Sequence, residues 1–384
     1  MLEFSLTDEQ AALVDQARRF TKERIVPVAA ECDRKHEFPM DVFRDAHELG
    51  FVNSVVPTEY GGSGLSEVDN VLLTEELAFG CTGIQTSITA NTLASTPILI
   101  AGTDAQKKKY LGMLTAEPVF AAYAITEPGA GSDAAALQTR AVKDGSDWIV
   151  TGSKCFITNA AWARWYVVFA TVDPGNRHKS IMAMAVDRDA PGVSLGKTED
   201  KLGQRASNTA VVNFDEVRVP AENVLAEPGK GFQLAMMTFD RTRPDIAAGA
   251  CGIMRRALEE SIAYAKERKT FGVPIADHQM VQVMIAEMGM KYEATRLLML
   301  KAAWNIDHQT KTSLVSAYAK AFGADSAMQV AIDAVQVFGG NGFITEYPVE
   351  KLMRDAKILQ IYEGTSQIQR MVIAKNLLGG VRTS

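Results

Sequence analysis

Apolar and polar positions follow a helical period in the first part of the chain. Thr7 and Gln10 have the spacing of a capping box at a helix start, and apolar residues then recur every three or four positions. Further helices are predicted over Val68–Phe79 and around Ala90–Ala101. Residues 1–120 are therefore expected to form an N-terminal α-helical domain.

The pattern changes near residue 121, where short β-branched and aromatic runs are separated by turn residues. Asp144-Gly145-Ser146 joins the first two runs, which predicts a hairpin. No long helical pattern separates the runs, so βαβ units are not supported, and an antiparallel sheet or barrel is expected over residues 121–230. The predicted strands are Thr139–Val142, Trp148–Thr151, Tyr166–Thr171, Ile181–Val186, Asn208–Phe214 and Glu216–Val219.

The helical period returns from Gly231 to the end of the chain. Three apolar stripes start near Ile246, Val281 and Ala317, and each continues for several turns. They predict an antiparallel bundle of long helices over residues 231–384. The chain as a whole is therefore expected to be an α+β protein with three domains.

Composition narrows the class of protein. Apolar residues make up 47% and charged residues 22% of the chain, which is typical of a globular protein. The net charge is −6, with acidic and basic residues interspersed, so no basic surface for nucleic acid is expected. No apolar stretch is long enough to cross a membrane, and the first residues have no signal-peptide or transit-peptide pattern, so we expect a cytoplasmic protein.

Cysteine and histidine residues are few and scattered. Cys32, Cys81, Cys155 and Cys251 form no CxxC pair, which favours buried, reduced thiols over disulfides. The histidines form no HExxH motif and no cluster with cysteine. No metal site is expected.

The first candidate for a ligand-binding segment is rich in glycine. Tyr123–Asp133 contains Gly129 and Gly131, which with Ala134 match the loose G-x-G-x-x-G/A pattern of dinucleotide folds. The next predicted element is a hairpin, not a helix, which argues against a Rossmann unit. The segment is either a loop that lets a flat or phosphorylated ligand approach the backbone or a plain turn.

Two further segments offer aromatic or charged groups. Lys154–Ala160 could present an aromatic face and a hydroxyl to a planar ring, or it could be an ordinary buried strand end. Phe239–Pro244 places one carboxylate and two guanidinium groups at the start of a long helix. These arginines could pair with phosphate or with a cofactor, or they could be solvated.

Two more segments follow long apolar helices. Glu267–Gly272, with His278 and Gln279, could bind pyrophosphate, although cations are favoured at a helix C-terminus in any case. Gln336–Phe343 holds three glycines in four residues. A helix C-cap accounts for one of these glycines well and for three less well.

The last segment contains a candidate base. Glu363 lies between Tyr362 and Gly364, just before a helix that Thr365 can cap. A carboxylate at a helix N-terminus often has only an electrostatic role. In an apolar pocket its pKa would rise toward neutrality, which suits a general base.

Together the six segments occur in the order and spacing of the acyl-CoA dehydrogenase family. The chain resembles this family over nearly its whole length, and most closely the short- and medium-chain members. The resemblance implies an N-terminal helical domain, a middle β-domain and a C-terminal four-helix bundle. It also implies a homotetramer with one FAD per subunit and electron transfer flavoprotein as partner.

The resemblance assigns roles to individual residues. The flavin would be held by Tyr123, Ile125, Thr126, Gly131, Ser132, Phe156, Ile157, Thr158, Thr365, Ser366 and Gln367. The FAD of a neighbouring subunit would be reached by Arg268, Lys269, Thr270, Phe271, His278, Gln279, Gln336, Val337, Gly339 and Gly340. Acyl-CoA would be bound by Ser132, Phe239, Asp240, Arg243, Tyr362, Glu363, Gly364, Gln85, Thr86 and Thr89.

By the same resemblance, Glu363 removes the α-proton of the acyl thioester while the β-hydrogen leaves as hydride to the flavin. The backbone N–H of Glu363 and a ribityl hydroxyl of FAD would polarise the thioester carbonyl. Some members carry the base on the long helix, at the position of Thr242 here, and threonine cannot serve as that base. Two departures from the family, Phe156 for Trp and Thr89 for a pocket Glu, leave the flavin packing and the acyl chain length open.

Other functions on this fold are less consistent with the sequence. An acyl-CoA oxidase usually has an extra C-terminal domain, whereas this chain ends at Ser384 soon after its last predicted helix. A DNA-binding relative would need a basic surface, and a flavin monooxygenase would lack the base at Glu363. An acyl-CoA dehydrogenase is therefore expected.

Overall fold

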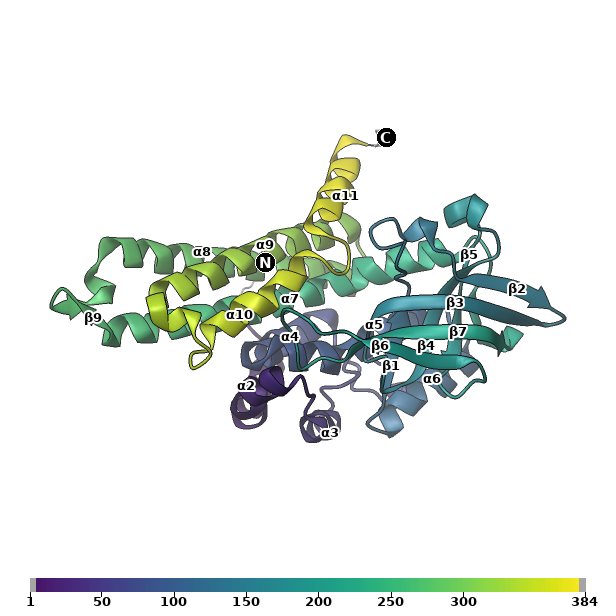
Figure 1. Cartoon of the computed structure of the whole chain (residues 1–384), viewed down its shortest axis with the longest axis horizontal. Coiled ribbons are helices and arrows are strands. Elements are labelled where there is room, and N and C mark those ends of the chain that lie inside the picture. The colour runs from purple at the N-terminus through teal and green to yellow at the C-terminus, as the bar shows by residue number, and fades with distance from the viewer. Residues whose placement is uncertain (1–4, 380–384) are drawn as a thin grey trace.

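The computed structural model describes residues 5–379, which form two helical regions and a β-region (Figure 1). The β-region lies at one end of the molecule, and three long helices run away from it. Secondary structure changes between Ala116 and Phe120 and again between Ala226 and Gly231, close to the boundaries expected from the sequence. Residues 1–4 and 380–384, which the expected terminal domains include, lie outside the described residues.

Within the described residues, the N-terminal region contains six α-helices. The predicted capping box at Thr7 is confirmed, since its side chain accepts from the backbone N–H of Gln10 while the Gln10 side chain accepts from that of Thr7. Ser66 and Thr103 begin two further helices with the same motif. The helices are α1 (Asp8–Phe20), α2 (Val26–Lys35), α3 (Met40–Glu48), α4 (Glu67–Gly80), α5 (Thr82–Ala101) and α6 (Asp104–Ala116).

The β-region is one curved sheet. Its strands are β1 (Phe120–Ala124), β2 (Arg140–Asp144), β3 (Asp147–Thr158), β4 (Ala163–Thr171), β5 (Ile181–Asp187), β6 (Val193–Thr198), β7 (Thr209–Val219) and β8 (Val224–Ala226). They follow the order β6-β7-β3-β2-β4-β5-β8, with β1 paired to β4. The β2–β3 hairpin is confirmed, with Asp144 opposite Asp147.

Two details of the sheet differ from the expectation. The pairs are antiparallel except that β1 runs parallel to β4, as does β2 at Arg140 opposite Thr171. The runs predicted as separate strands, 208–214 and 216–219, form the single strand β7 except for Asn208, which precedes it. Glu216 has a left-handed backbone (φ 50°) beside an irregularity in the pairing with β3, and this bulge interrupts the alternation of side chains.

The central strand β4 is buried on both sides. Trp165, Val167 and Phe169 pack with residues of α5 and α6, whereas Tyr166 and Val168 pack inside the curve of the sheet. A strand covered on both faces has a continuous apolar sequence instead of an alternating one. This burial fixes the sheet against the helices that line the cavity described below.

The C-terminal region is built from long helices. They are α7 (Gly231–Glu267), α8 (Gln279–Asp307) and α9 (Ser313–Phe338), with the shorter α10 (Val349–Ala356) and α11 (Ser366–Leu378) packed on α9. A small hairpin of β9 (Lys269–Thr270) and β10 (Val273–Pro274) joins α7 to α8 at the end far from the sheet (Figure 1). Among residues 5–379, no helix combines the length and the apolarity needed to cross a membrane.

α4 and α7 pack at very short range. A Cβ added to Gly252 on α7 would lie 2.6 Å from the Cβ of Ala78 and 2.7 Å from the carbonyl oxygen of Glu75. Only glycine fits at that position without displacing α4. The N-terminal region therefore packs closely, through α4, on the long helix α7.

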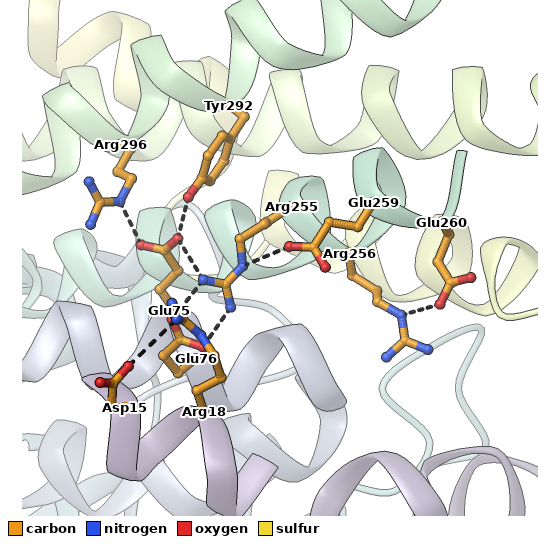
Figure 2. Close-up of polar contacts among 10 residues, drawn as sticks. All are labelled: Asp15, Arg18, Glu75, Glu76, Arg255, Arg256, Glu259, Glu260, Tyr292 and Arg296. Carbon is orange, nitrogen blue, oxygen red and sulfur yellow. Dashed lines mark hydrogen bonds and ion pairs between the residues drawn. The ribbon is translucent and has the colours of Figure 1, made fainter. Parts of the chain in front are cut away.

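Buried ion pairs accompany this close packing (Figure 2). Both carboxylate oxygens of Glu76 on α4 accept from Arg255 on α7, at 2.6 and 2.7 Å, and Arg18 on α1 donates to the same carboxylate at 2.9 Å. Burial raises the pKa of Glu76, but the hydrogen bonds from Arg255 and Arg18 outweigh burial and hold that pKa below its ordinary value. Glu76 is therefore ionised at neutral pH and bridges α1, α4 and α7.

The neighbouring Glu75 extends the network to α8 (Figure 2). Its carboxylate accepts from the hydroxyl of Tyr292 at 2.7 Å and from Nε of Arg296 at 3.1 Å. Glu75 and Glu76 are each 3% exposed at their side chains. Four helices from both helical regions thus share one buried ionic cluster.

Removing Arg255 is expected to destabilise the protein. Arg255→Met would leave Glu76 buried with Arg18 alone as its cationic partner, and the melting temperature should fall by about 5 °C or more. Thermal unfolding followed by circular dichroism measures this change. The matched control is Glu259→Gln, because Glu259 is 58% exposed and lies 3.9 Å from Arg255; an equal loss in both variants would contradict the role given to the buried pair.

Candidate active site

A cavity of about 580 Å³ lies where the sheet meets the helices of both other regions. Its walls come from α5, the ends of β1 and β3, the first half of α7 and the segment before α11. Residues expected at the site that line it are Gln85, Thr86, Thr89, Tyr123, Ile125, Thr126, Gly131, Ser132, Phe156, Ile157, Thr158, Phe239, Arg243, Tyr362, Glu363, Gly364 and Thr365. Five segments far apart in the sequence therefore meet at one cavity.

Glu363 stands on a short connection between the 3₁₀ turn Lys357–Gln360 and α11. Its backbone is left-handed, with φ 52°, and the following Gly364 has φ 90°. A left-handed glutamate is uncommon and is held only where its surroundings fix it. The turn aims the carboxyl group into the cavity, where the hydroxyl of Thr242 donates to it at 2.8 Å.

Burial sets the acidity of Glu363. The accessible surface that its side chain retains faces the cavity, and loss of hydration raises its pKa from the ordinary value to about 7. The hydrogen bond from Thr242 and the charges of Arg243 and Lys320 act in the opposite direction. The result is a carboxylate basic enough to take a proton and available as the ionised form near neutral pH.

Two side chains fix the connection that carries Glu363. Lys320 on α9 is fully buried and donates to the carbonyl oxygen of Gly364 at 2.6 Å. Nε2 of Gln369 on α11 donates to the carbonyl oxygens of Glu363 and Gly364, both at 3.1 Å. Burial lowers the pKa of Lys320 to about 8, against the opposing effect of Glu363.

The FDRTRP segment lies inside α7, which begins at Gly231, and not at the helix start as expected. Pro244 has no N–H, so the carbonyl of Asp240 loses its helical partner, and the Ser316 hydroxyl donates to that carbonyl at 2.8 Å. Arg243 lines the cavity and pairs with the Asp240 carboxylate at 2.5 Å, whereas Asp240 is outside the cavity lining. The guanidinium of Arg243 is therefore held by an ion pair within its own helix.

The wall formed by β1 and β3 is suited to a flat ring. Phe156 is 64% exposed and has a left-handed backbone (φ 58°), which turns its ring out of the strand beside Thr158. A Cβ added to Gly129 or Gly131 would meet nothing within 4 Å, so the adjoining loop leaves open space. An aromatic ring, a hydroxyl and free backbone beside a void fit an isoalloxazine ring.

A buried ion pair supports this wall from behind. Nζ of Lys154 on β3 donates to the Glu127 carboxylate at 2.7 Å and to the carbonyl of Ile125 at 3.1 Å. Glu127 also accepts from the backbone N–H groups of Gln138 and Thr139. These bonds fix the loop after β1 to the strand that carries Phe156.

The remaining expected residues do not reach this cavity. The end of α7 lies 25 residues beyond Thr242, about 37 Å along the helix, and the group around Arg268–His278 follows it. Within that group the Thr270 hydroxyl and Nε2 of His278 are 2.9 Å apart. Gln336, Val337, Gly339 and Gly340 lie at the same distant end, at the C-terminus of α9.

The structure places Thr365 at the cavity and the two following residues beside it. Thr365 caps α11, as predicted, by accepting from the N–H of Ile368 at 3.1 Å. The Ser366 hydroxyl donates to Asp325 at 2.8 Å and is buried, and Gln367 lies outside the cavity lining.

Three residues that contact the turn of Glu363 or line the cavity were not identified from the sequence: Lys320, Gln369 and Asp245. Lys320 interrupts an apolar stretch of α9, and a charged residue in such a stretch is the one signal that could have identified it. No sequence pattern indicated Gln369, because its contacts are hydrogen bonds to the backbone carbonyls of residues five and six positions earlier. Asp245 follows Pro244 on α7 and was not distinguished from the neighbouring charges.

Family models match the chain in three consecutive parts. Residues 7–117 match the acyl-CoA dehydrogenase N-terminal domain, 122–217 the middle domain and 229–378 the C-terminal domain. The three matches together cover most of the chain.

Relatives match over the whole length. A probable medium-chain specific acyl-CoA dehydrogenase 2, mitochondrial, of Caenorhabditis briggsae is 46% identical over 99% of this chain and 93% of its own. The structure of butyryl-CoA dehydrogenase from Megasphaera elsdenii has a TM-score of 0.96 and 40% identity, over 98% of this chain and 100% of that one. A chain from structural work on the electron transferring flavoprotein of Acidaminococcus fermentans has a TM-score of 0.96 and 41% identity, with the same coverage.

Loss of the Thr242 hydroxyl is expected to make Glu363 a weaker acid. That hydroxyl stabilises the ionised carboxylate, so in Thr242→Val the pKa of Glu363 should rise from about 7 to above about 8. The protonated carboxyl should then persist to higher pH in an infrared titration, with Glu363→Gln as the reference that lacks the signal. A pKa that is unchanged or lower would contradict this prediction.

Proposed function

Because this chain belongs to the acyl-CoA dehydrogenase family of FAD-dependent oxidoreductases, we propose that it oxidises a short- or medium-chain acyl-CoA to the trans-2-enoyl-CoA, with Glu363 as the base. The observation that carries the assignment of the base is the Glu363 carboxyl group, aimed into the cavity with a pKa of about 7. Relatives named for medium-chain and butyryl substrates support this range of chain lengths.

The chemical difficulty is the α-proton, which is far less acidic than a carboxylic acid. The negative charge that develops on the thioester oxygen must therefore be stabilised as the proton leaves. Among the described residues, the backbone N–H of Glu363 has no hydrogen-bond partner, so it is free to donate to that oxygen. Oxyanion donors of this kind typically contribute about 3–4 kcal/mol each to transition-state stabilisation.

Each surrounding group has a part in this proposal. Thr242 holds the carboxylate oxygen of Glu363 at 2.8 Å and so orients the base toward the substrate. Lys320 and Gln369 fix the peptide groups on both sides of Gly364, which keeps the free N–H in one position. Phe156 and Thr158 would hold the FAD, which would supply the acceptor for the hydride from the β-carbon.

The part of the cavity wall that α5 forms bears on the length of the acyl chain. Gln85 and Thr89, which line the cavity, are joined by a hydrogen bond of 2.8 Å, and Thr89 stands where the resemblance suggested a glutamate in medium-chain members. This uncharged pair adds no fixed charge to the cavity wall. We therefore keep both short and medium chains in the proposal.

A homotetramer is also proposed, in which a second copy covers α8. Exposed apolar residues recur at every seventh position along this helix, as Val283, Met290, Leu297 and Trp304. A seven-residue apolar repeat is the pattern by which one helix packs lengthwise on another. Phe271, 97% exposed on the β9–β10 hairpin, lies at the same end of the molecule as the residues expected to reach a neighbour's FAD.

Electron transfer flavoprotein is the proposed electron acceptor. The support is the resemblance of this chain to one from structural work on such a flavoprotein in Acidaminococcus fermentans. The cytoplasmic location expected from the sequence stays a prediction.

Replacing the base is the direct test of the proposed reaction. Glu363→Gln should keep FAD and still bind acyl-CoA, but flavin reduction should slow by about a hundredfold to ten thousandfold, because no group remains to take the α-proton. Anaerobic stopped-flow absorbance of the flavin, with a series of acyl-CoAs from short to long chain, measures the rate. A variant that bleaches as fast as the wild type would disprove the role of Glu363.

A charge in the apolar repeat should disrupt the assembly. Met290 is 64% exposed, and Met290→Lys should yield a smaller species in light scattering and retain less FAD after gel filtration. Val142→Lys is the matched control, because Val142 is 52% exposed on β2 and away from α8. A wild-type monomer, or a Met290→Lys protein with unchanged mass, would contradict the proposed assembly.

A further inference from the structure

The cavity wall next to Glu363 carries a second carboxyl group that the proposed dehydrogenation does not use. Asp245 stands three residues after Thr242 on α7, so both lie on one face of the helix, about 4.5 Å apart along its axis. The Asp245 side chain lines the cavity and is 8% exposed. A carboxyl group in this position can contact the acyl part of a bound thioester.

Among the described residues, one of the two carboxyl oxygens of Asp245 accepts a hydrogen bond. Oδ1 accepts from Nδ2 of Asn70 at 2.8 Å, and the Asn70 amide is fixed in that orientation because its Oδ1 accepts from the Ser54 hydroxyl at 2.7 Å. Within residues 5–379, no side chain or backbone group bonds Oδ2 of Asp245, and no lysine or arginine pairs with it. The unused oxygen is therefore available to a ligand.

The surroundings of Asp245 are acidic. Burial, with the neighbouring carboxyl groups of Glu67 and Glu363, raises the pKa of Asp245 well above its ordinary value. Arg243 is paired with Asp240 and does not compensate. The raised pKa favours the protonated carboxyl group, which can both donate and accept a hydrogen bond.

A second polar group lies beside the same stripe of α7. Nε2 of Gln85 donates to Thr89. Oε1 of Gln85 faces α7 at Gly249, four residues after Asp245, where it would lie 3.4 Å from a Cβ added to that glycine. Within the described part of the chain, Oε1 of Gln85 accepts no hydrogen bond. Gln85 and Gly249 both line the cavity. An apolar cavity is thereby supplied with a carboxyl group and an amide oxygen on adjacent walls.

Resting on the proposed function, we propose that the preferred acyl group carries a neutral hydrogen-bonding substituent, a hydroxyl, on a carbon beyond Cβ, where Asp245 and Gln85 bind it. A plain alkyl chain would cover these polar atoms without satisfying them, which opposes its binding. An acyl group that ends in a carboxylate would bring a further negative charge to a wall that already carries the carboxyl groups of Asp245 and Glu363. Asp245 is accordingly a specificity-determining residue and not a catalytic one.

The test compares acyl-CoAs of equal chain length: hexanoyl-CoA, 5-hydroxyhexanoyl-CoA and 5-aminohexanoyl-CoA. The efficiency of flavin bleaching is measured under anaerobic conditions, and the dissociation constants of the matching 2-enoyl-CoAs are measured by calorimetry. The wild type should favour the hydroxyl compound over hexanoyl-CoA by roughly tenfold to a hundredfold in both measurements.

Two variants separate hydrogen bonding from charge. Asp245→Leu should lose the preference for the hydroxyl compound and gain activity on hexanoyl-CoA. Asp245→Asn keeps the size and the ability to donate and accept, so it should retain most of the preference. Thermal unfolding verifies that both variants are folded.

The outcomes distinguish this inference from the proposed function. Equal or better use of hexanoyl-CoA by the wild type would overturn the inference and leave the dehydrogenase standing. A preference for the amino compound that Asp245→Asn abolishes would replace the neutral substituent by a cation and overturn the inference too. Absence of bleaching with every compound, in protein that holds FAD and still binds the hydroxylated enoyl-CoA more tightly, would refute the proposed reaction while supporting the assignment of Asp245.

Discussion

The packing of α7 against α4 is the constraint on which the rest of the structure depends. Gly252 lets the two backbones approach, and the buried carboxylates of Glu75 and Glu76 are then satisfied by cations from α1, α7 and α8. Buried charges of this kind tolerate only one arrangement of partners, because an unpaired carboxylate in the interior is strongly destabilising. The rotation and position of α7 are thereby fixed, and with them the face that carries Thr242 and Asp245.

Most of the architecture could be predicted from the sequence, since the hydrophobic period changes with the element type. The order of helical, β and helical regions, the β2–β3 hairpin and the caps at Thr7 and Thr365 are confirmed. The parallel pairing of β1 with β4 was not predictable, because it joins strands separated by a hairpin and depends on tertiary packing. The bulge at Glu216 was not predictable either, and the two runs predicted on either side of Asp215 form one strand.

The active-site prediction was limited in a different way. Segments with several unusual residues, such as those around Gly131 and Glu363, could be found by their composition and by family resemblance, and they do line one cavity. Single polar residues on regular helices could not be found in this way. Lys320 and Gln369 contact the turn that carries Glu363, and Asp245 lines the cavity, only because the fold brings distant elements together. A helical period predicts which face of a helix a residue occupies, but not which groups it contacts there.

The proposed base and the wall that fits the flavin belong to different parts of the chain. Glu363 is carried by a short connection before α11, whereas Phe156 and the glycine-rich loop are held by the Lys154–Glu127 pair within the sheet. A lineage of this fold can therefore lose its base by one substitution while its cofactor shell stays intact. A change at the position of Glu363 could therefore open the way to other flavin chemistry. Membership of the family alone does not establish that a protein dehydrogenates its substrate.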